Sequence, residues 1–470
     1  MSSNILIKII ENKKKEIALR KKSFSIEILK GNLKPSSRCF FAALNNDQSN
    51  FILECKKASP SKGLIRENFD LQEILNVYKD YASAISVLTD FSYFQGSHQY
   101  LQEVSDSVTQ PVLCKDFFIE RYQIYEARYF GADAILLMLS VLNDEQYIEL
   151  ALLAKKLNLD ILTEVHDSQE MQRALKLDAK IIGINNRNLI DLTIDINTTE
   201  KLIKELSKKD RSDRIFISES GISEHHQINR LAPFVNGFLV GSSIMSKYDM
   251  RKQCKKLIYG NIKICGLTTA ESAITAFDNG AIYGGLIFYA KSPRNITLEQ
   301  AKLIIQSAPL QYVGVFVNES VENILYIANT LNLTIIQLHG DESSETIDRV
   351  KQVLPLCQIW KAVNIQSTFK KLVFDNKSID KYLLDTYTNE SRGGSGKIFD
   401  WSIVNNLDKD KIVLAGGLNV KNIKEAKSLA TFALDINSGV EDKPGKKNVT
   451  KIKELFLELK TLNKIVKHNG

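Results

Sequence analysis

The sequence predicts an α/β protein built from two tandem (β/α)8 barrels. Short apolar runs alternate with longer amphipathic segments along nearly the whole chain, which is typical of parallel strands joined by helices through right-handed crossovers. Eight such runs precede residue 255 and eight follow residue 260, and eight parallel strands close a barrel. The chain has 470 residues, whereas a single core stops growing at about 250–300 residues. Two barrels are therefore favoured over one large domain.

The stretch from Phe51 to Gly63 shows the expected strand pattern most clearly. Side chains alternate between the two faces of a strand, so Ile52, Glu54 and Lys56 share one face. That face becomes charged only where the strand ends, which suits a barrel with a filled interior and reactive groups at the carboxyl ends of its strands. The eight runs of this half are residues 51–56, 84–89, 112–115, 134–138, 160–164, 181–185, 214–218 and 237–240.

The second half repeats this rhythm after a segment with the pattern of a helix, residues 245–259. No Pro/Gly/Ser-rich linker separates the halves, so we expect one barrel in residues 1–256 and the other in residues 257–470. Residues 1 to about 45 are expected to form one helix, from the spacing of Ile5 and Ile9, followed by a connecting loop. The second set of runs is 261–265, 282–288, 312–317, 333–338, 358–363, 381–385, 411–415 and 432–436.

Composition excludes several classes of protein. The first apolar run is too short for a signal peptide, and the longest, Ala134 to Leu142, falls short of the about 20 residues that span a bilayer. The six cysteines form neither CxxC pairs nor Cys/His clusters, so we expect a reducing cytoplasm and no metal site. The net charge is +7, but no basic stripe is interleaved with aromatic residues, which argues against nucleic-acid binding. The charge supports a mild attraction for anionic metabolites.

Polar residues recur at the carboxyl ends of the strands of the first half. Charges that share one barrel mouth are costly unless they are paired or used. Two lysines and three carboxylates can pair, and close cations can lower a lysine pKa towards that of a useful acid. Glycines after the seventh and eighth strands can hold phosphate with their backbone N–H groups. The candidates are Glu54, Lys56, Lys115, Glu164, Asn185, Arg187, Glu219, Ser220, Gly221, Gly241 and Ser242.

The second half has a comparable set. Cys265 follows the first strand on the same face as Lys263, where a deprotonated thiol could act as a base. Asp385 ends the sixth strand, His339 follows the fourth, and Arg294 could fork onto a carboxylate. Residues 393–401, Gly-Gly-Ser-Gly-Lys-Ile-Phe-Asp-Trp, are a mobile-loop candidate. The phosphate candidates after the seventh and eighth strands are Gly416, Gly417, Ser438 and Gly439.

These motifs resemble two enzymes of tryptophan biosynthesis over nearly the whole chain. Indole-3-glycerol-phosphate synthase is matched by residues 51–63, Cys114–Phe117, Thr163–Val165, Gly183–Arg187, Ser218–Ile222 and Leu239–Ser243. Phosphoribosylanthranilate isomerase is matched by Lys263–Thr268, Ser292–Arg294, Gln337–Gly340, Gly393–Gly396, Asp400–Trp401, Ala415–Gly417 and Asn437–Glu441. The order of the two halves matches the fused bifunctional enzyme of bacteria, which implies a carbon–carbon lyase joined to an isomerase, both of the TIM-barrel fold.

The resemblance also implies a role for each candidate in the synthase half. Lys115 would be the general acid and Glu164 the base that helps to expel water. The other charges of the ring would be Glu54, Lys56 and Glu219. Substrate would be oriented by Asn185, Arg187 and Ser220, and its phosphate held by Gly221, Gly241 and Ser242.

In the isomerase half, the resemblance makes Cys265 the general base and Asp385 the general acid. Arg294 and His339 would contact substrate, and Gly416, Gly417, Ser438 and Gly439 would hold phosphate. The Amadori rearrangement and the ring closure need acids and bases, so no cofactor or metal is expected. The expected partners are phosphorylated small molecules, with no nucleic acid or membrane, and the expected state is a monomer.

Two departures and two alternatives remain. Asn448 stands where the isomerase usually has Asp, although Asn can still cap the following helix, and residues 386–392 lengthen the segment before Gly393. Another pair of phosphosugar barrels, such as isomerases or aldolases that form a Schiff base on Lys56 or Lys115, is one alternative. The other is that one barrel is inactive and serves as a binding module.

Overall fold

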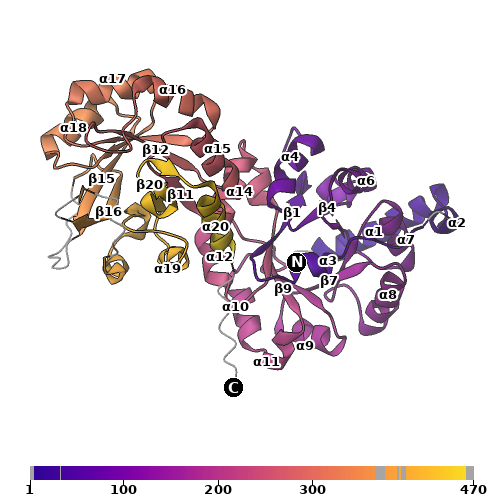
Figure 1. Ribbon diagram of the computed structural model, residues 1–470. Helices are drawn as coiled ribbons and strands as arrows, with labels where there is room; N and C mark the ends of the chain where they lie inside the picture. Colours follow the sequence, from indigo (N-terminus) through magenta and orange to yellow (C-terminus); the bar gives the residue numbers. More distant parts are fainter. Residues whose placement is uncertain (1–4, 32, 366–375, 389–390, 393–398, 462–470) are drawn as a thin grey trace. The chain divides into compact units, whose positions relative to one another are not determined.

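The computed structural model describes residues 5–31, 33–365, 376–388, 391–392 and 399–461. The chain forms two compact units. Unit 1 ends at Cys254 and also includes Thr461, and unit 2 is Lys255–Lys460. Each unit contains its own barrel, with helices around the strands (Figure 1).

Unit 1 contains a closed barrel of eight parallel strands, as predicted. The expected strand bounds differ from the observed ones by at most one residue. A short antiparallel pair, β2 (Ala58–Ser59) and β3 (Gly63–Leu64), follows the first strand. In order around the barrel, the strands are β1 (Asn50–Cys55), β10 (Gly237–Val240), β9 (Ile215–Glu219), β8 (Ile181–Asn185), β7 (Asp160–Val165), β6 (Ala134–Met138), β5 (Val112–Lys115) and β4 (Ala84–Leu88).

Most of the helices that follow these strands begin at polar caps. Asp70, for example, accepts hydrogen bonds from the backbone N–H groups of Gln72 and Glu73, which satisfies donors that a helix start leaves unpaired. Asn143 does the same in a reciprocal capping box. The helices are α4 (Leu71–Tyr81), α5 (Phe91–Phe94), α6 (His98–Ser107), α7 (Arg121–Tyr129), α8 (Asp144–Lys156), α9 (Ser168–Lys176), α10 (Asn197–Lys204), α11 (Lys208–Ser212), α12 (His225–Leu231), α13 (Ser242–Met245) and α14 (Met250–Tyr259).

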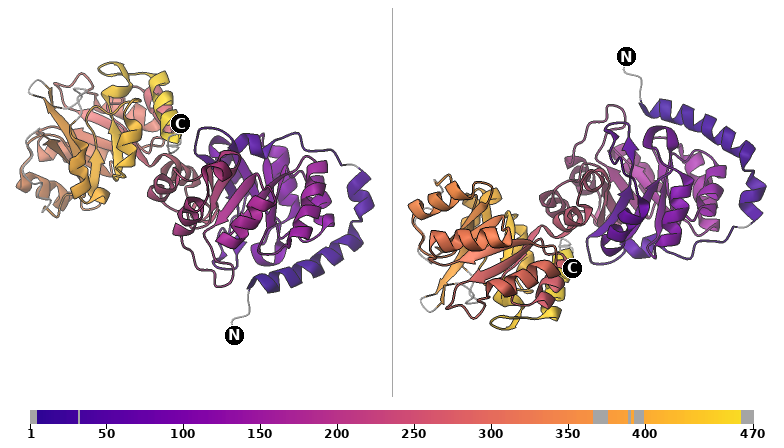
Figure 2. Two further views of the ribbon diagram at one scale, coloured as in Figure 1. Left: turned by 90° about the horizontal axis from the view of Figure 1, so that it is seen from below. Right: turned by 90° about the horizontal axis from the view of Figure 1, so that it is seen from above.

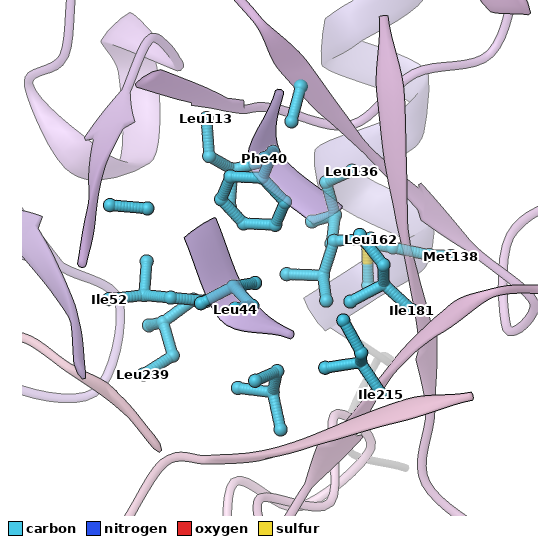
Figure 3. Close-up of a cluster of buried hydrophobic side chains, with 13 residues drawn as sticks. Phe40, Leu44, Ile52, Leu113, Leu136, Met138, Leu162, Ile181, Ile215 and Leu239 are labelled. Atoms are coloured by element: carbon cyan, nitrogen blue, oxygen red, sulfur yellow. The ribbon is translucent and has the colours of Figure 1, made fainter. Parts of the chain in front are cut away.

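The expectation of a single helix and a loop in residues 1–45 is wrong. Three helices precede the barrel: α1 (Ile5–Ser23), α2 (Ile26–Gly31) and α3 (Phe40–Leu44). Phe40 and Leu44 of α3 are fully buried in the barrel core, among side chains that begin the strands, such as Ile181 and Ile215 (Figure 3). α3 therefore closes the end of the barrel opposite the polar mouth. A helix of five residues is too short to show a period, and burial rather than propensity stabilises it.

Unit 2 contains a second barrel of eight parallel strands, closed by the pairing of β15 with β16. The predicted bounds agree to within three residues. Residues 386–388 continue β16, which pairs antiparallel with β17 (Ser391–Arg392), whereas Gly393–Gly396 lie outside the described residues. The barrel strands are β11 (Asn261–Ile264), β12 (Tyr283–Phe288), β13 (Gln311–Phe316), β14 (Ile335–Leu338), β15 (Gln358–Ile365), β16 (Lys381–Thr388), β18 (Ile412–Leu414) and β19 (Ala433–Ile436).

The remaining elements of unit 2 surround these strands (Figure 1). Asn448 accepts a hydrogen bond of 2.8 Å from the backbone N–H of Lys451, so it caps α20 as predicted. None of the helices in the described part of the chain is long and apolar enough to cross a membrane. The elements are α15 (Ala270–Asn279), α16 (Leu298–Ser307), α17 (Val321–Leu331), α18 (Ser344–Val353), η1 (Trp401–Asn406), η2 (Lys409–Lys411), α19 (Ile423–Ser428), η3 (Ser438–Val440), β20 (Glu441–Lys443), β21 (Lys446–Lys447) and α20 (Val449–Lys460).

Candidate active sites

A cavity of about 350 Å³ lies at the carboxyl ends of the strands of unit 1. Every residue that the sequence singled out in this half lines it. They are Glu54, Lys56, Lys115, Glu164, Asn185, Arg187, Glu219, Ser220, Gly221, Gly241 and Ser242. The parallel register brings them together, because strand ends of one sense meet at one rim.

Lys115, the last residue of β5, is the centre of the charge network in this cavity. Its Nζ lies 2.8 Å from Oε2 of Glu219 and 3.5 Å from Oε2 of Glu164. The other oxygen of Glu164 accepts a hydrogen bond of 3.0 Å from Nδ2 of Asn185. A second pair lies on the rim, where Nζ of Lys56 is 2.5 Å from Oε2 of Glu54. The carboxylates hold the lysines in fixed positions at the mouth.

The expectation that close cations lower a lysine pKa is wrong for Lys115. Burial lowers the pKa of Lys115, but the nearby carboxylates of Glu219, Glu164 and Glu54 outweigh it, so the net pKa is raised. Burial also raises the pKa of Glu219, against the opposing effect of Lys115. Lys115 is therefore an ammonium at neutral pH and can donate a proton.

Two glycines leave room for the carboxylates. A Cβ atom at Gly183 would overlap Oε1 of Glu219, and one at Gly241 would overlap Oε2 of Glu54. Ser220 and Gly221 have positive φ values of 65° and 80°, so the loop after β9 turns back sharply towards the loop after β10. The hydroxyl of Ser243 donates to the carbonyl of Ile222 at 2.8 Å and ties these two loops together.

The sequence missed the apolar part of this cavity. Side chains from α1, from the α5 segment and from the loops after β5 and β8 line it: Ile5, Leu6, Ile9, Phe94, Phe117, Leu189, Leu192 and Ile194. The spacing of Ile5 and Ile9 indicated an amphipathic helix, but it carried no signal for which surface that helix would cover.

In unit 2 the predicted residues lie in or directly after the carboxyl-terminal parts of their strands, and Asp385 lies within β16, which continues to Thr388. Lys263 in β11 is fully buried, and its Nζ contacts Oδ2 of Asp435 at 2.7 Å and Oε1 of Gln337 at 3.0 Å. Nε2 of Gln337 lies 2.8 Å from Nδ1 of His339, whose Nε2 lies 3.4 Å from Oδ2 of Asp385. A chain of polar side chains therefore runs across the barrel from β11 to Asp385 in β16.

Cys265 comes directly after β11 and is buried. Burial raises the pKa of the Cys265 thiol, and the nearby ammonium of Lys263 opposes that effect. The backbone of Gly285 on β12 lies close against the sulfur, since a Cβ there would be 2.6 Å from Sγ. Cys265 is thus a mostly protonated thiol at neutral pH, next to a buried cation.

Arg294 forms a bidentate ion pair with a carboxylate, as the sequence predicted. Its Nε and one terminal nitrogen lie 2.9 and 2.8 Å from the two oxygens of Glu441, and Nζ of Lys447 lies 2.8 Å from the same carboxylate. A Cβ at Gly266 would lie 2.7 Å from Cδ of Arg294. The Arg294 side chain is therefore fixed beside the loop that carries Cys265.

The phosphate candidates of unit 2 lie in two adjoining loops. Gly416 and Gly417 have φ values of 82° and 67°. A Cβ at Gly439 would overlap the carbonyl of Leu418, so the loops after β18 and β19 are packed together.

The family models match both units. Residues 6–257 match "Indole-3-glycerol phosphate synthase", and residues 262–458 match "N-(5'phosphoribosyl)anthranilate (PRA) isomerase".

Relatives cover the chain almost completely. The tryptophan biosynthesis protein TrpCF of Haemophilus influenzae is 46% identical over 97% of this chain and 97% of its own. TrpCF of Vibrio parahaemolyticus is 48% identical over 97% and 94%. Among solved structures, phosphoribosyl anthranilate isomerase of Thermotoga maritima is 38% identical, with a TM-score of 0.37, covering 43% of this chain and 98% of its own. The chain belongs to the TrpCF family of bifunctional tryptophan-biosynthesis enzymes and combines an indole-3-glycerol-phosphate synthase with a phosphoribosylanthranilate isomerase.

Proposed function

We propose that the synthase reaction takes place in the cavity of unit 1, with Lys115 as its general acid. The observation that carries this assignment is the ammonium of Lys115 between Glu219 and Glu164. The substrate is 1-(2-carboxyphenylamino)-1-deoxyribulose 5-phosphate. Lys115 donates a proton to the oxygen of its ketone while the ring carbon attacks the ketone carbon and carbon dioxide leaves. The hydroxyl that forms takes up a second proton and departs as water, while a base removes a proton from the neighbouring CH2 carbon and the indole double bond forms.

Glu164 is the proposed base for the dehydration. Its carboxylate lies within reach of Lys115 and is oriented by the amide of Asn185, so a proton can pass between acid and base at one end of the substrate. Glu54, Lys56 and Glu219 complete the charged ring. Asn185, Arg187 and Ser220 orient the substrate, and Gly221, Gly241 and Ser242 hold its phosphate.

In unit 2 we assign Cys265 as general base and Asp385 as general acid. Asp385 protonates the ring oxygen of N-(5-phosphoribosyl)anthranilate, which opens the ribose ring, and Cys265 then removes the proton from C2. Support comes from the polar chain that ends at Asp385 and from the cation beside Cys265. Arg294 and His339 contact the substrate, and Gly416, Gly417, Ser438 and Gly439 hold its phosphate.

At Lys115, one of the two lysines considered for a Schiff base, the aldolase alternative is disfavoured by the charge state of the amine. A Schiff base needs a neutral amine, whereas the carboxylates around Lys115 raise its pKa. The six cysteines are free, which supports the proposed cytoplasmic location. We further propose that the chain acts as a monomer without nucleic-acid partners, with the synthase in residues 1–256 and the isomerase in residues 257–470.

The assignment is tested by supplying each intermediate separately to variants of the whole chain. Lys115→Ala should abolish indole-glycerol-phosphate formation and leave the isomerase unchanged, and Cys265→Ala should do the reverse. In each variant the unaffected reaction reports the amount of chain present, and the circular dichroism spectrum reports whether the changed unit is folded. If both variants retain both reactions, the assignment of the sites is wrong.

A further inference from the structure

Lys13 of α1 is a fully buried lysine in unit 1 that the mechanism above does not use. Its side chain is 0% exposed, and its Nζ lies 2.7 Å from Oδ2 of Asp90 and 2.8 Å from Oδ1 of Asp116. It also lies 3.0 Å from Oε2 of Glu16 on the same helix. A buried ammonium is costly unless it is well paired, so this contact fixes Lys13 in one place.

The two aspartates connect α1 to the rim of the cavity. Asp90 follows β4 and caps α5, and it lines the cavity itself. Asp116 comes directly after Lys115. Its Oδ1 accepts a hydrogen bond of 2.7 Å from the backbone N–H of Phe117, and its Oδ2 accepts one of 2.9 Å from the hydroxyl of Thr89. The loop after β5 is therefore held in place by bonds that do not involve Lys13.

The two halves of α1 are held by different contacts. After Lys13, Ile17 packs with Leu29 and Tyr122, and Arg20 forms a 2.9 Å ion pair with Glu126 on α7. Before Lys13, the side chains of Ile5, Leu6 and Ile9 line the cavity. Figure 2 shows α1, in indigo, running along one side of unit 1.

Both polar and apolar side chains line the cavity. Its polar groups include the charged ring around Lys115 and the loops after β9 and β10, whereas the residues that α1 contributes are apolar and share the lining with Phe94 and Phe117. An aromatic ring is stabilised by burial against such a wall. The aryl end of the substrate therefore belongs on the α1 side.

We propose that Lys13 is a positioning residue for the synthase: its ammonium pins α1 so that Ile5, Leu6 and Ile9 form a fixed apolar wall for the aryl ring. This inference rests on the proposed placement of the synthase reaction in unit 1. Lys115 keeps its own carboxylate partners and its loop when Lys13 is lost. The effect of Lys13 therefore falls on substrate binding rather than on proton transfer.

The decisive comparison is between Lys13→Met and Lys14→Met in the whole chain. Methionine has a similar length without the charge, and Lys14 is the neighbouring, exposed lysine on the same helix. Lys13→Met should raise the KM of the synthase about tenfold, as loss of part of an apolar contact predicts, with kcat changed less than threefold. Hydrogen exchange in residues 5–16 should become faster. Lys14→Met should change neither quantity. Isomerase activity on the same chain reports the amount of chain present, and circular dichroism compares the folding of the two variants.

A fall in kcat at constant KM would overturn the proposal, because Lys13 would then act through Lys115. Unchanged kinetics would also overturn it. Ile5→Ala, which leaves no buried charge unpaired, provides a second test if Lys13→Met folds poorly, and it should raise the KM about threefold. If both single variants fold, Ile5→Ala should raise the KM less in the Lys13→Met background than in the wild-type background, since the apolar wall is already displaced. Additive effects on the KM would contradict the proposal. Failure of the site assignment itself would appear separately, as synthase activity that survives Lys115→Ala.

Discussion

Nζ of Lys115, at the end of β5, lies 2.8 Å from Oε2 of Glu219, at the end of β9, across the mouth of the first barrel. The two strands are four positions apart around the barrel, so this ion pair joins opposite sides of the rim. It keeps Lys115 protonated and aims its ammonium at the centre of the cavity. A change that displaces Glu219 should therefore be felt at the reacting atoms.

Gly183→Ala should displace Glu219 without replacing any charged residue. The new Cβ would overlap Oε1 of Glu219, so the carboxylate must move and release Lys115. Misplacement by about 1 Å can cost about 100-fold in rate, and we expect a loss of that order in synthase kcat with isomerase activity unchanged. Gly31→Ala is the matched control, because no atom lies within 4 Å of a Cβ at that position. Equal synthase rates for the two variants would show that the position of Glu219 does not affect the synthase reaction.

Gly285→Ala makes the corresponding change in the second barrel. Its Cβ would lie 2.6 Å from Sγ and 2.9 Å from Cα of Cys265, and the backbone contact leaves little room for relaxation. Isomerase kcat/KM should fall at least about tenfold, whereas synthase activity measured with its own substrate should stay at the wild-type level. An isomerase with normal activity would mean that Cys265 is not the base.

Isomerase activity should rise with pH. Burial raises the pKa of the Cys265 thiol, so only a small fraction is thiolate at neutral pH, and that fraction grows about tenfold for each pH unit below the pKa. We expect kcat/KM for N-(5-phosphoribosyl)anthranilate to increase from pH 7 to 9. Cys39→Ser, which changes an exposed thiol, should leave the profile intact. A flat profile over this range would argue against a base that is mostly protonated at neutral pH, as Cys265 is proposed to be.

His98 and Glu126 form a buried pair in unit 1 whose titrations oppose each other. Nε2 of His98 lies 3.5 Å from Oε2 of Glu126. Burial lowers the pKa of His98 to about 4, while burial, against the effect of Arg20, raises the pKa of Glu126 to about 7. As pH falls from about 6.5 to 4, the unfolded chain protonates His98 first and stability decreases. As pH falls from about 7 to 4.5, folded Glu126 binds a proton first and stability increases.

His98→Gln should therefore reveal how protonation of Glu126 changes the stability of unit 1. Shifts of about 2.5 units correspond to about 3 kcal/mol each, so the two nearly cancel in the wild-type protein. Relative to wild type, the variant should gain stability in unit 1 between pH 7 and 4.5. Urea unfolding followed by circular dichroism measures this, and fluorescence of Trp360 and Trp401, both in unit 2, records the other unit separately. Parallel pH curves for the two proteins would contradict the prediction.

Sequence patterns alone predicted the strands, their order along the chain and the residues at their carboxyl ends. The strand that contains Glu54 alternates between its two faces and becomes charged only at its end. Because apolar side chains fill the interior of a parallel barrel, this pattern places Glu54 at the rim. The short helix α3 was missed since five residues carry no period, and burial of Phe40 and Leu44 stabilises it. The pKa of Lys115 was predicted in the wrong direction because neighbours across a barrel are set by closure and register, not by spacing along the chain. Tertiary structure alone decided that α1 lines the cavity and that Lys13 is paired with Asp90 and Asp116, because contacts between residues so distant in the chain exist only after the barrel has closed.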